Sequence, residues 1–381
     1  MSSSSLLDEI AEIGRDPGTG GYYRYSFSET DERLRHWFTT LAHELGFQTE
    51  TDRNGNLWAM RGTGPFLVTG SHLDSVPNGG AFDGPLGIAT AFAALDRADS
   101  QRDVAVVAFA EEEGARFGIA CLGSRLMTGA IDADRARQLS DRAGISLEDA
   151  MRRSGIDPSG LGADSRRLEQ IETFLELHIE QGRALVDLES ALGLGEAIWP
   201  HGRWRLDFSG RADHAGTTRM EDRDDPMLSY ARTALAVSEH AAAHDARATF
   251  GRLQLEPNAT NAIPSRVTAW LDARAASDQE LSSLVDSIPT MPSLVVTAES
   301  VSSAVTFDPD LRARVSKVLG GPPAVPTAAG HDAGILASCG IPTAMIFVRN
   351  PSGVSHSPAE YVGPEDCEAG VEALARVFAD L

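Results

Sequence analysis

The segment Gly70-Ser71-His72-Leu73-Asp74-Ser75-Val76-Pro77 begins just after the apolar run Phe66-Leu67-Val68, and Phe82-Asp83-Gly84-Pro85 follows it closely. A histidine, an aspartate two residues later and a second aspartate 11 residues after the histidine share one loop rich in glycine and proline. Imidazole and carboxylate groups are ligands of zinc, manganese, cobalt and nickel in proteins. This segment therefore predicts a metal site at the end of a buried strand.

Size and charge narrow the class of protein. The chain has 381 residues, long enough for two domains. Its formal net charge of -22 argues against nucleic-acid binding, because phosphates are bound by clusters of Lys and Arg. We find no apolar stretch of about 18 residues that would predict a membrane span, and no signal peptide. Three cysteines without a CxxC pair argue against a disulfide framework, so we expect a cytoplasmic protein.

Four apolar runs predict buried parallel strands, because such strands are covered on both faces. They lie at 66–69, 104–110, 171–177 and 343–348. Helices are expected between them, at 87–97, 146–154 and 332–339. Strands that alternate with helices favour a three-layer α/β/α domain.

The middle of the chain has a different pattern. Its predicted order is strand, helix, two strands, helix and strand, at 204–208, 226–244, 249–255, 266–274, 278–288 and 293–298. This βαββαβ order is typical of a small ferredoxin-like α+β domain with an antiparallel sheet. We therefore predict a first domain at 1–196 plus 309–381, with a second domain inserted at 197–308.

Candidate ligands follow each of the four buried strands. His72 and Asp83 come after the first strand, three glutamates after the second, and His178 and His356 after the third and fourth. Ligands of open α/β sheets bind at the carboxyl ends of the strands, so we expect these groups to meet at one edge. Any one of them alone would most often be structural, but carboxylates at the edge of a core are costly unless paired or metal-bound.

The number of candidate ligands suits two metal ions. From the residues alone, His72 and Glu113 could hold one ion and His178 or His356 the other, with a carboxylate between them.

Six motifs together resemble one family, the dinuclear-metal amidohydrolases related to aminoacylase and carboxypeptidase. The chain is most similar to the branch that holds allantoate amidohydrolase and N-carbamoyl-L-amino acid hydrolase, and the similarity covers essentially the whole chain. The motifs are His72-x-Asp74, Gly80-x-Phe82-Asp83-Gly84-Pro85-Leu86-Gly87, Glu112-Glu113-Gly114-x-Arg116-Phe117, Glu176-Leu177-His178-Ile179-Glu180-Gln181-Gly182, Asp213-His214-Ala215-Gly216-Thr217-Thr218 and Ser355-His356-Ser357-Pro358.

The resemblance implies a role for each ligand. The implied ligands of two divalent metal ions (manganese, zinc, cobalt or nickel) are His72, Asp83, Glu113, His178 and His356. Asp83 would bridge the ions, with the two histidines His72 and His178 on one side. Asp74 would orient the His72 ring, and Glu112 would be the general base.

The resemblance also implies residues that bind substrate. His214 would stabilise the oxyanion and would come from the partner subunit, which implies a homodimer joined through the inserted dimerisation or lid domain. Arg274 would bind a substrate carboxylate, because a guanidinium matches a carboxylate bidentately. Asn261 and Gln181 would contact the ureido group. Arg219, where the branch usually has proline, and His331 receive no role from the sequence.

The first expectation for activity is hydrolysis of a linear ureido C–N bond, with allantoate converted to ureidoglycine, ammonia and carbon dioxide. The alternative is an N-carbamoyl-L-amino acid as substrate. A di- or aminopeptidase is disfavoured because the motifs offer no extra acidic residue for a free amine. A non-catalytic metal-binding protein is disfavoured because Glu112 is intact.

Overall fold

The computed structural model describes residues 1–98 and 100–381. The chain forms two compact units, Met1–Ala197 with Thr306–Leu381 and Ile198–Val305.

The first unit is built on a nine-stranded sheet in which β14 pairs with β6 and the other strands run in the order β1-β2-β4-β3-β5-β15-β6-β13. Its strands are β1 (Gln48–Thr51), β2 (Leu57–Arg61), β3 (Phe66–His72), β4 (Val104–Phe109), β5 (Ile171–Ile179), β6 (Leu192–Ile198), β13 (Val305–Thr306), β14 (Ala324–Thr327) and β15 (Thr343–Val348). The central strands β4, β3, β5 and β15 are mutually parallel. These are the four strands predicted from apolar runs, and that prediction is confirmed.

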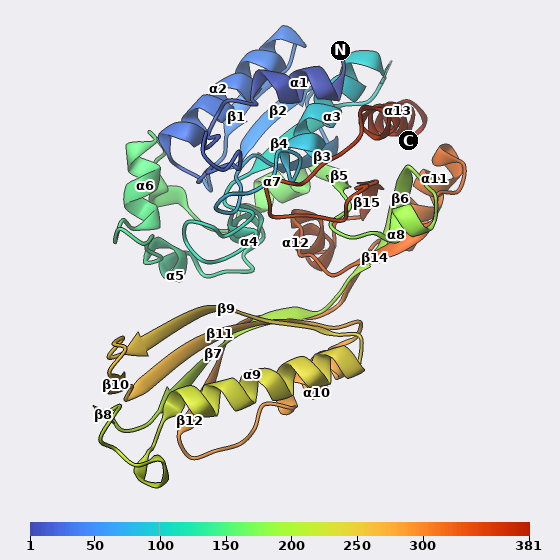
Figure 1. The fold of residues 1–381 in the computed structure, drawn as a ribbon. Helices are drawn as coiled ribbons and strands as arrows, with labels where there is room; N and C mark the ends of the chain where they lie inside the picture. The colour runs from blue at the N-terminus through green and yellow to red at the C-terminus, as the bar shows by residue number, and fades with distance from the viewer. Residues whose placement is uncertain (99) are drawn as a thin grey trace. The chain divides into compact units, whose positions relative to one another are not determined.

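Helices cover both faces of this sheet, and α5 and α6 pack beside α4 in a separate cluster. The helices of this unit are α1 (Ser3–Glu9), α2 (Glu29–Glu44), α3 (Pro85–Arg97), α4 (Leu122–Thr128), α5 (Ala133–Arg137), α6 (Leu147–Arg153), α7 (Ser165–Glu169), α8 (Ala184–Asp187), α11 (Pro309–Leu319), α12 (Asp332–Ser338) and α13 (Pro364–Asp380). Figure 1 shows α3 and α13 on one side of the central strands and α12 on the other. The three-layer α/β/α prediction is therefore confirmed.

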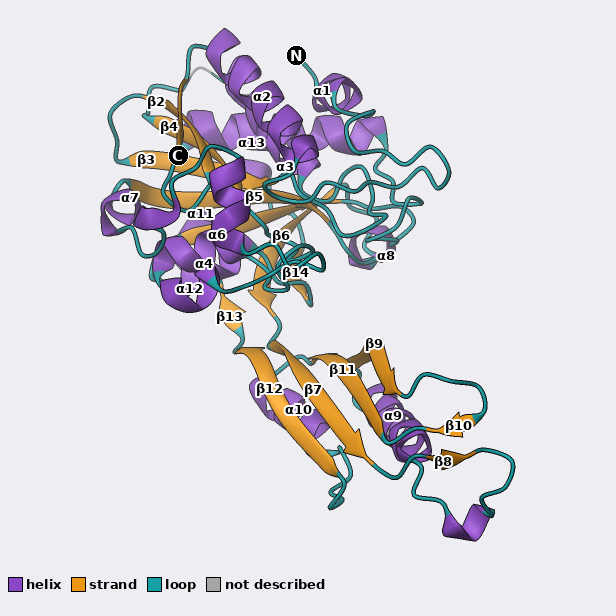
Figure 2. Cartoon of the chain, turned by 90° about the vertical axis from the view of Figure 1, so that its left-hand side faces the viewer, coloured by secondary structure: helices purple, strands orange, loops and turns teal. Residues whose placement is uncertain are grey.

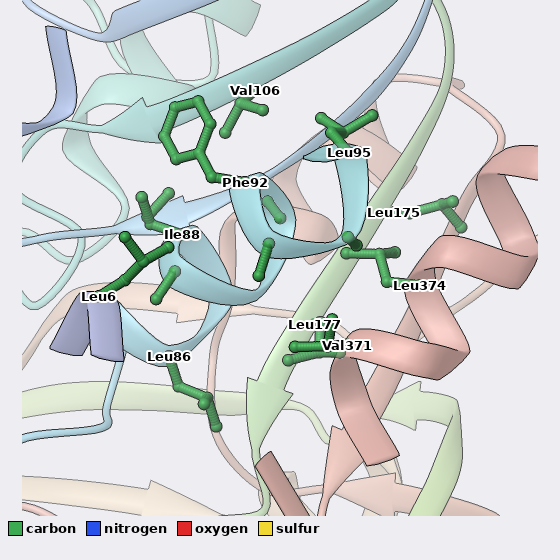
Figure 3. Close-up of a cluster of buried hydrophobic side chains, with 14 of the residues drawn as sticks. Leu6, Leu86, Ile88, Phe92, Leu95, Val106, Leu175, Leu177, Val371 and Leu374 are labelled. Carbon is green, nitrogen blue, oxygen red and sulfur yellow. The ribbon is translucent and has the colours of Figure 1, made fainter. Parts of the chain in front are cut away.

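The side chains of β5 contact both layers of helices, because successive side chains of a strand point to opposite faces of the sheet. Leu175 and Leu177 pack into the core formed with α3 and α13, where Leu175 lies near Leu374 and Leu177 near Val371 (Figure 3). The intervening Glu176 faces α12, since its carboxylate accepts a hydrogen bond from the Ala333 amide. One face of β5 therefore packs into the apolar core, and its other face carries a polar side chain that contacts α12.

The second unit contains β7 (His201–Ser209), β8 (Asp213–His214), α9 (Pro226–Ala243), β9 (Arg247–Glu256), β10 (Ala262–Ile263), β11 (Arg266–Arg274), α10 (Asp278–Asp286) and β12 (Leu294–Ser302). Its main sheet has the order β12-β7-β11-β9 and is antiparallel throughout. Figure 2 shows α9 and α10 on the same side of these strands. The predicted βαββαβ order of a ferredoxin-like unit is confirmed.

Local sequence explains where the helices of this unit begin. Asp225 accepts a hydrogen bond from the Met227 amide and is followed by Pro226, so it caps α9. Ser277 and Glu280 form a capping box at α10: the Ser277 hydroxyl accepts from the Glu280 amide and donates to its carboxylate.

No helix among the described residues is both long and apolar enough to cross a membrane.

Candidate metal centre

His72 is the last residue of β3, three residues beyond the predicted strand end, and it is buried. Its Nδ1 lies 3.0 Å from the backbone oxygen of Asp74. Because a carbonyl oxygen can only accept, Nδ1 carries a proton, and in the neutral ring Nε2 presents a lone pair. Nε2 lies 3.5 Å from Asp83 Oδ1. Gly84 permits this close approach, since it has φ +82° and a Cβ there would lie 2.5 Å from the ring.

His178 is held in the same way near the end of the neighbouring strand β5. Its Nδ1 lies 2.9 Å from the backbone oxygen of Ile179, so its Nε2 also presents a lone pair. Nε2 lies 3.1 Å from Asp83 Oδ1, is buried and has no hydrogen-bond partner among the described residues. Two buried acceptors that face each other this closely repel one another unless a proton or a metal cation lies between them, and although burial lowers the pKa of the His178 ring, Asp83 raises it. The donor set therefore fits a divalent metal ion.

Asp83 belongs to two groups of candidate ligands. One is His72, Asp83 and His178, and the other is Asp83, Glu113 and His356, and in each the ligand atoms lie within 4.8 Å of one another. In the second group, His356 Nε2 lies 3.5 Å from Asp83 Oδ2 and 3.4 Å from Glu113 Oε1. The two carboxylate oxygens thus face different groups, which is the geometry that a bridging aspartate requires.

Asp74 holds the loop of three consecutive glutamates that follows β4, residues 111–113, which we call the glutamate loop. Its Oδ1 accepts the Glu112 amide at 3.2 Å, and its Oδ2 accepts the Glu113 amide at 3.1 Å. We expected Asp74 to orient the His72 ring. Its backbone oxygen makes the 3.0 Å contact with that ring, whereas its carboxylate lies 3.6 Å away. The side chain of Asp74 therefore chiefly holds the loop, and the main chain holds the ring.

The three consecutive glutamates point in different directions. Glu111 has φ +55°, and its Oε1 accepts the amides of Arg116 and Phe117, so it supports its own loop. Glu112 is buried and places Oε2 3.7 Å from His72 Nε2, whereas Glu113 joins the second ligand group. Glu112 and Glu113 therefore lie beside the candidate ligands, whereas Glu111 does not.

Electrostatics favour cations at this site. Burial raises the pKa of Glu112 and Glu113 well above the usual range, and neighbouring carboxylates add to the effect. For Asp83, burial raises the pKa, but the imidazole of His178 and then that of His72 more than offset this and hold it well below its usual range. A buried cluster of carboxylates this dense calls for positive charge beyond the two rings.

Gln181, expected to contact substrate, lies beside Asp83. Its Nε2 donates to Asp83 Oδ2 at 2.7 Å and to the Ser355 hydroxyl oxygen at 3.4 Å. The Ser355 hydroxyl itself donates to Asp83 Oδ2 at 2.9 Å. The preceding motif residue Glu180 is structural, because its carboxylate accepts the amides of Ala184 and Leu185 at the start of α8.

Sequence reasoning missed Glu360, which follows His356 by four residues. Its Oε1 accepts the amides of Phe82 and Asp83, both at 2.9 Å. Burial and then the charge of Asp83 raise the pKa of Glu360 to about 7. Only its nearness to His356 in the chain could have drawn attention to it.

A third group of candidate ligands, Glu176, His178 and His331, shares His178 with the first. His331 is buried at the start of α12, and its ring centroid lies 4.5 Å from that of His178. The adjacent Asp332 accepts the Ser124 hydroxyl at 2.5 Å. His331, which had no role from sequence, thus packs against a candidate ligand.

The other three predicted substrate residues belong to the second unit. His214 and Asn261 lie side by side, because Ala262 pairs with His214 across the β8–β10 ribbon and the Ala215 amide donates to the Asn261 backbone oxygen. Arg274 ends β11 and donates to both carboxylate oxygens of Asp272. Arg219 is an exposed residue whose guanidinium lies 3.5 Å from Glu221.

Comparison with known proteins identifies the family. The profile of peptidase family M20/M25/M40 matches residues 68–380. The N-carbamoyl-L-amino acid amidohydrolase of Geobacillus stearothermophilus is 34% identical over 395 residues, covering 97% of this chain and 95% of the relative. The allantoate amidohydrolase of Bacillus subtilis is 31% identical over 397 residues, covering 98% and 95%.

Solved structures agree with these relatives. The crystal structure of AtUAH in complex with glyoxylate matches with a TM-score of 0.89 and 26% identity, covering 99% of this chain and 96% of that one. An amidase of the hydantoinase/carbamoylase family from Burkholderia vietnamiensis matches with a TM-score of 0.88 and 27% identity, covering 99% and 96%. The chain therefore belongs to peptidase family M20/M25/M40, and it is a hydrolase of carbon–nitrogen bonds other than peptide bonds.

Proposed function

We propose that this protein is a two-metal amidohydrolase that cleaves the C–N bond of a linear ureido group, with allantoate as its first candidate substrate. The observation that carries the proposal is the pair of ligand groups that share Asp83, with Glu112 beside them. The allantoate and N-carbamoyl amino acid relatives, at 31% and 34% identity, support the ureido group as the target.

In this proposal, His72 and His178 would hold one cation and Glu113 and His356 the other, and Asp83 would contribute to both sites. Divalent cations at these positions supply Lewis-acid chemistry toward a water molecule and the scissile carbonyl. Glu112 takes the proton from the attacking water and returns it to the leaving nitrogen. Proton transfer by a positioned carboxylate contributes about 100- to 10,000-fold to such rates.

Four side chains bind the substrate in this proposal. The His214 imidazole donates a hydrogen bond to the oxyanion of the tetrahedral intermediate. Arg274 binds the substrate carboxylate, and Asn261 contacts the ureido group. Gln181 offers its buried side-chain oxygen, which has no hydrogen-bond partner among the described residues, to a ureido N–H.

An N-carbamoyl-L-amino acid is the second candidate substrate, favoured by the 34% identical relative from Geobacillus stearothermophilus. The two substrates share a carboxylate next to a ureido nitrogen. Allantoate carries a second ureido group where the amino acid has its side chain. An ammonia-release assay of metal-reconstituted protein on allantoate and a panel of N-carbamoyl amino acids separates them, and release from neither would refute the proposal.

The role of Glu112 is tested by Glu112→Gln, with Glu111→Gln as the matched control. Glu112→Gln should bind metal normally and lose turnover by about 100-fold or more, because the proton acceptor is gone. Glu111→Gln keeps an acceptor for the amides of Arg116 and Phe117 and should retain turnover. Full activity in Glu112→Gln would remove it from the mechanism.

We also propose a homodimer in which His214 of one subunit completes the site of the other. Glu112→Gln and His214→Ala homodimers should both be inactive. Co-expressed as a mixed dimer, they should regain activity, because one of the two sites then has both residues intact. Light scattering that shows a monomer, or mixed dimers that remain inactive, would contradict the shared site.

A further inference from the structure

The ring of His214 is held by the backbone of its own loop. The amide of Gly216 donates to His214 Nδ1 at 3.0 Å, and the amide of Thr217 donates to the same atom at 3.1 Å. An amide N–H can only donate, so the nitrogen that receives both bonds presents its lone pair to them. A proton on Nδ1 would point at two other N–H groups. The ring proton therefore resides on Nε2.

The candidate metal ligands show the opposite arrangement. In His72 and His178, Nδ1 faces a backbone carbonyl oxygen at 3.0 Å and 2.9 Å, so Nδ1 is protonated and Nε2 is free to bind a cation. His214 has two N–H donors where those residues have a carbonyl. The main chain thus prepares two histidines as ligands and the third as a donor.

The His214 loop is tied down at several points. The Thr218 hydroxyl donates to the His214 backbone oxygen at 2.8 Å. The Arg223 guanidinium donates to the backbone oxygens of Ala215 at 2.6 Å and Thr218 at 3.1 Å. A Cβ at Gly216 would lie 3.3 Å from His214 Cε1, so glycine lets the amide reach the ring without crowding it.

We propose that the amides of Gly216 and Thr217 lock His214 in the Nε2–H tautomer, which makes it a hydrogen-bond donor and excludes it as a metal ligand. Nδ1 is occupied by the two amides, and Nε2 carries the ring proton. What this donor serves, the oxyanion of the tetrahedral intermediate, rests on the proposed function. The tautomer itself rests on the loop geometry alone. A donor whose direction is set before substrate arrives costs no reorganisation during the reaction.

The test is nitrogen NMR of the full-length protein labelled with ¹⁵N-histidine, because the two ring nitrogens have distinct shifts when protonated and unprotonated. The His214 signals are assigned as those missing from His214→Ala. We expect Nδ1 in the unprotonated range and Nε2 in the protonated range. An Nδ1–H tautomer, or a mixture of the two tautomers, would overturn the proposal.

Zinc loading supplies the second readout. Added Zn²⁺ should move the Nε2 signals of the ligand histidines and leave His214 Nε2 protonated. Loss of that proton on zinc loading would show that His214 can act as a ligand and would refute the exclusion.

Two substitutions at one position test the amides directly. Thr217→Pro removes one N–H and should shift His214 toward a mixture of tautomers, whereas Thr217→Ala keeps the N–H and should retain the wild-type spectrum. Identical spectra for a folded Thr217→Pro and the wild type would remove this amide from the lock. If Thr217→Pro fails to fold, the wild-type spectrum still decides the tautomer. None of these readouts requires turnover, so failure of the tautomer and failure of the amidohydrolase proposal are distinguishable.

Discussion

Glu360→Ala is the perturbation that the structure makes most informative, because Glu360 supports the proposed bridging ligand without belonging to either ligand group. One carboxylate oxygen of Glu360 accepts the amides of Phe82 and Asp83, both at 2.9 Å. The side chain is buried, so water is not already present to take over these bonds. Alanine would leave two amide donors without an acceptor.

The size of the effect follows from these two hydrogen bonds. A hydrogen bond to a charged group contributes about 1.5–3 kcal/mol to stability. Two such bonds give an expected loss of about 3–6 kcal/mol at a pH above the pKa of Glu360, where its carboxylate is charged, and water that enters the cavity brings the result toward the lower value. Because the Asp83 backbone would lose its anchor, metal affinity should also fall, by about 10- to 100-fold as for other residues that orient a ligand.

The matched control is Glu360→Gln, which keeps a carbonyl oxygen for both amides and nearly the same shape. We expect it to lose about 2–3 kcal/mol, less than Glu360→Ala, since the two hydrogen bonds remain and only the charge assistance is removed. Unfolding of the metal-free variants in urea measures stability, and calorimetric titration with Mn²⁺ or Zn²⁺ measures affinity. Wild-type stability and affinity in Glu360→Ala would refute the reasoning. Equal damage in both variants would show that charge, and not the acceptor, matters.

Three further predictions follow from buried polar contacts and from the ligand groups. Asn56→Ala should lower the free energy of unfolding by about 2–4 kcal/mol, because Asn56 accepts the Ala110 amide just before the glutamate loop and donates to Asp52; an unchanged urea midpoint would contradict this. Arg24→Ala should lower the free energy of unfolding by a similar amount, since this buried guanidinium donates to the backbone oxygens of Ile10 and Ile13. Calorimetric unfolding of Arg24→Ala that matches the wild type would contradict this prediction. Removal of metal by a chelator should lower Tm, and re-addition of metal should restore it, because a ligand present at 100 times its Kd stabilises the folded state by about 2.7 kcal/mol. A Tm that is the same with and without metal would contradict the proposed metal site.

Local sequence patterns predict several of the strands and helices of this fold. The apolar runs of β4 and β15 mark buried strands because both faces of a central parallel strand contact helices. The alternation in β11 marks a strand with one covered face, and Val267, Ala269, Leu271 and Ala273 are indeed buried. Patterns with periods of two or 3.6 residues report burial directly, so the four central parallel strands of the first unit and the order of the main elements of the second could be predicted. The outer strands β1, β2, β6, β13 and β14 and most helices of the first unit were not predicted.

The sequence also indicated which residues are candidate ligands. His72, Asp83, His178 and His356 were selected because each follows an apolar run that predicts a buried strand, and the ends of parallel strands meet at one edge. Glu113 was chosen among three consecutive glutamates by the family resemblance. Their residue types and their order along the chain needed no coordinates.

Only the tertiary structure decided how those ligands are arranged. It assigned the two oxygens of Asp83 to different groups, turned Glu111 away from its neighbours and brought Glu360, 277 residues along the chain, to the Asp83 amide. It also set the direction of each imidazole through backbone partners, carbonyls for His72 and amides for His214. Such contacts join residues distant in sequence or depend on single backbone angles. Neither leaves a periodic pattern, so the amino-acid sequence alone could not reveal them.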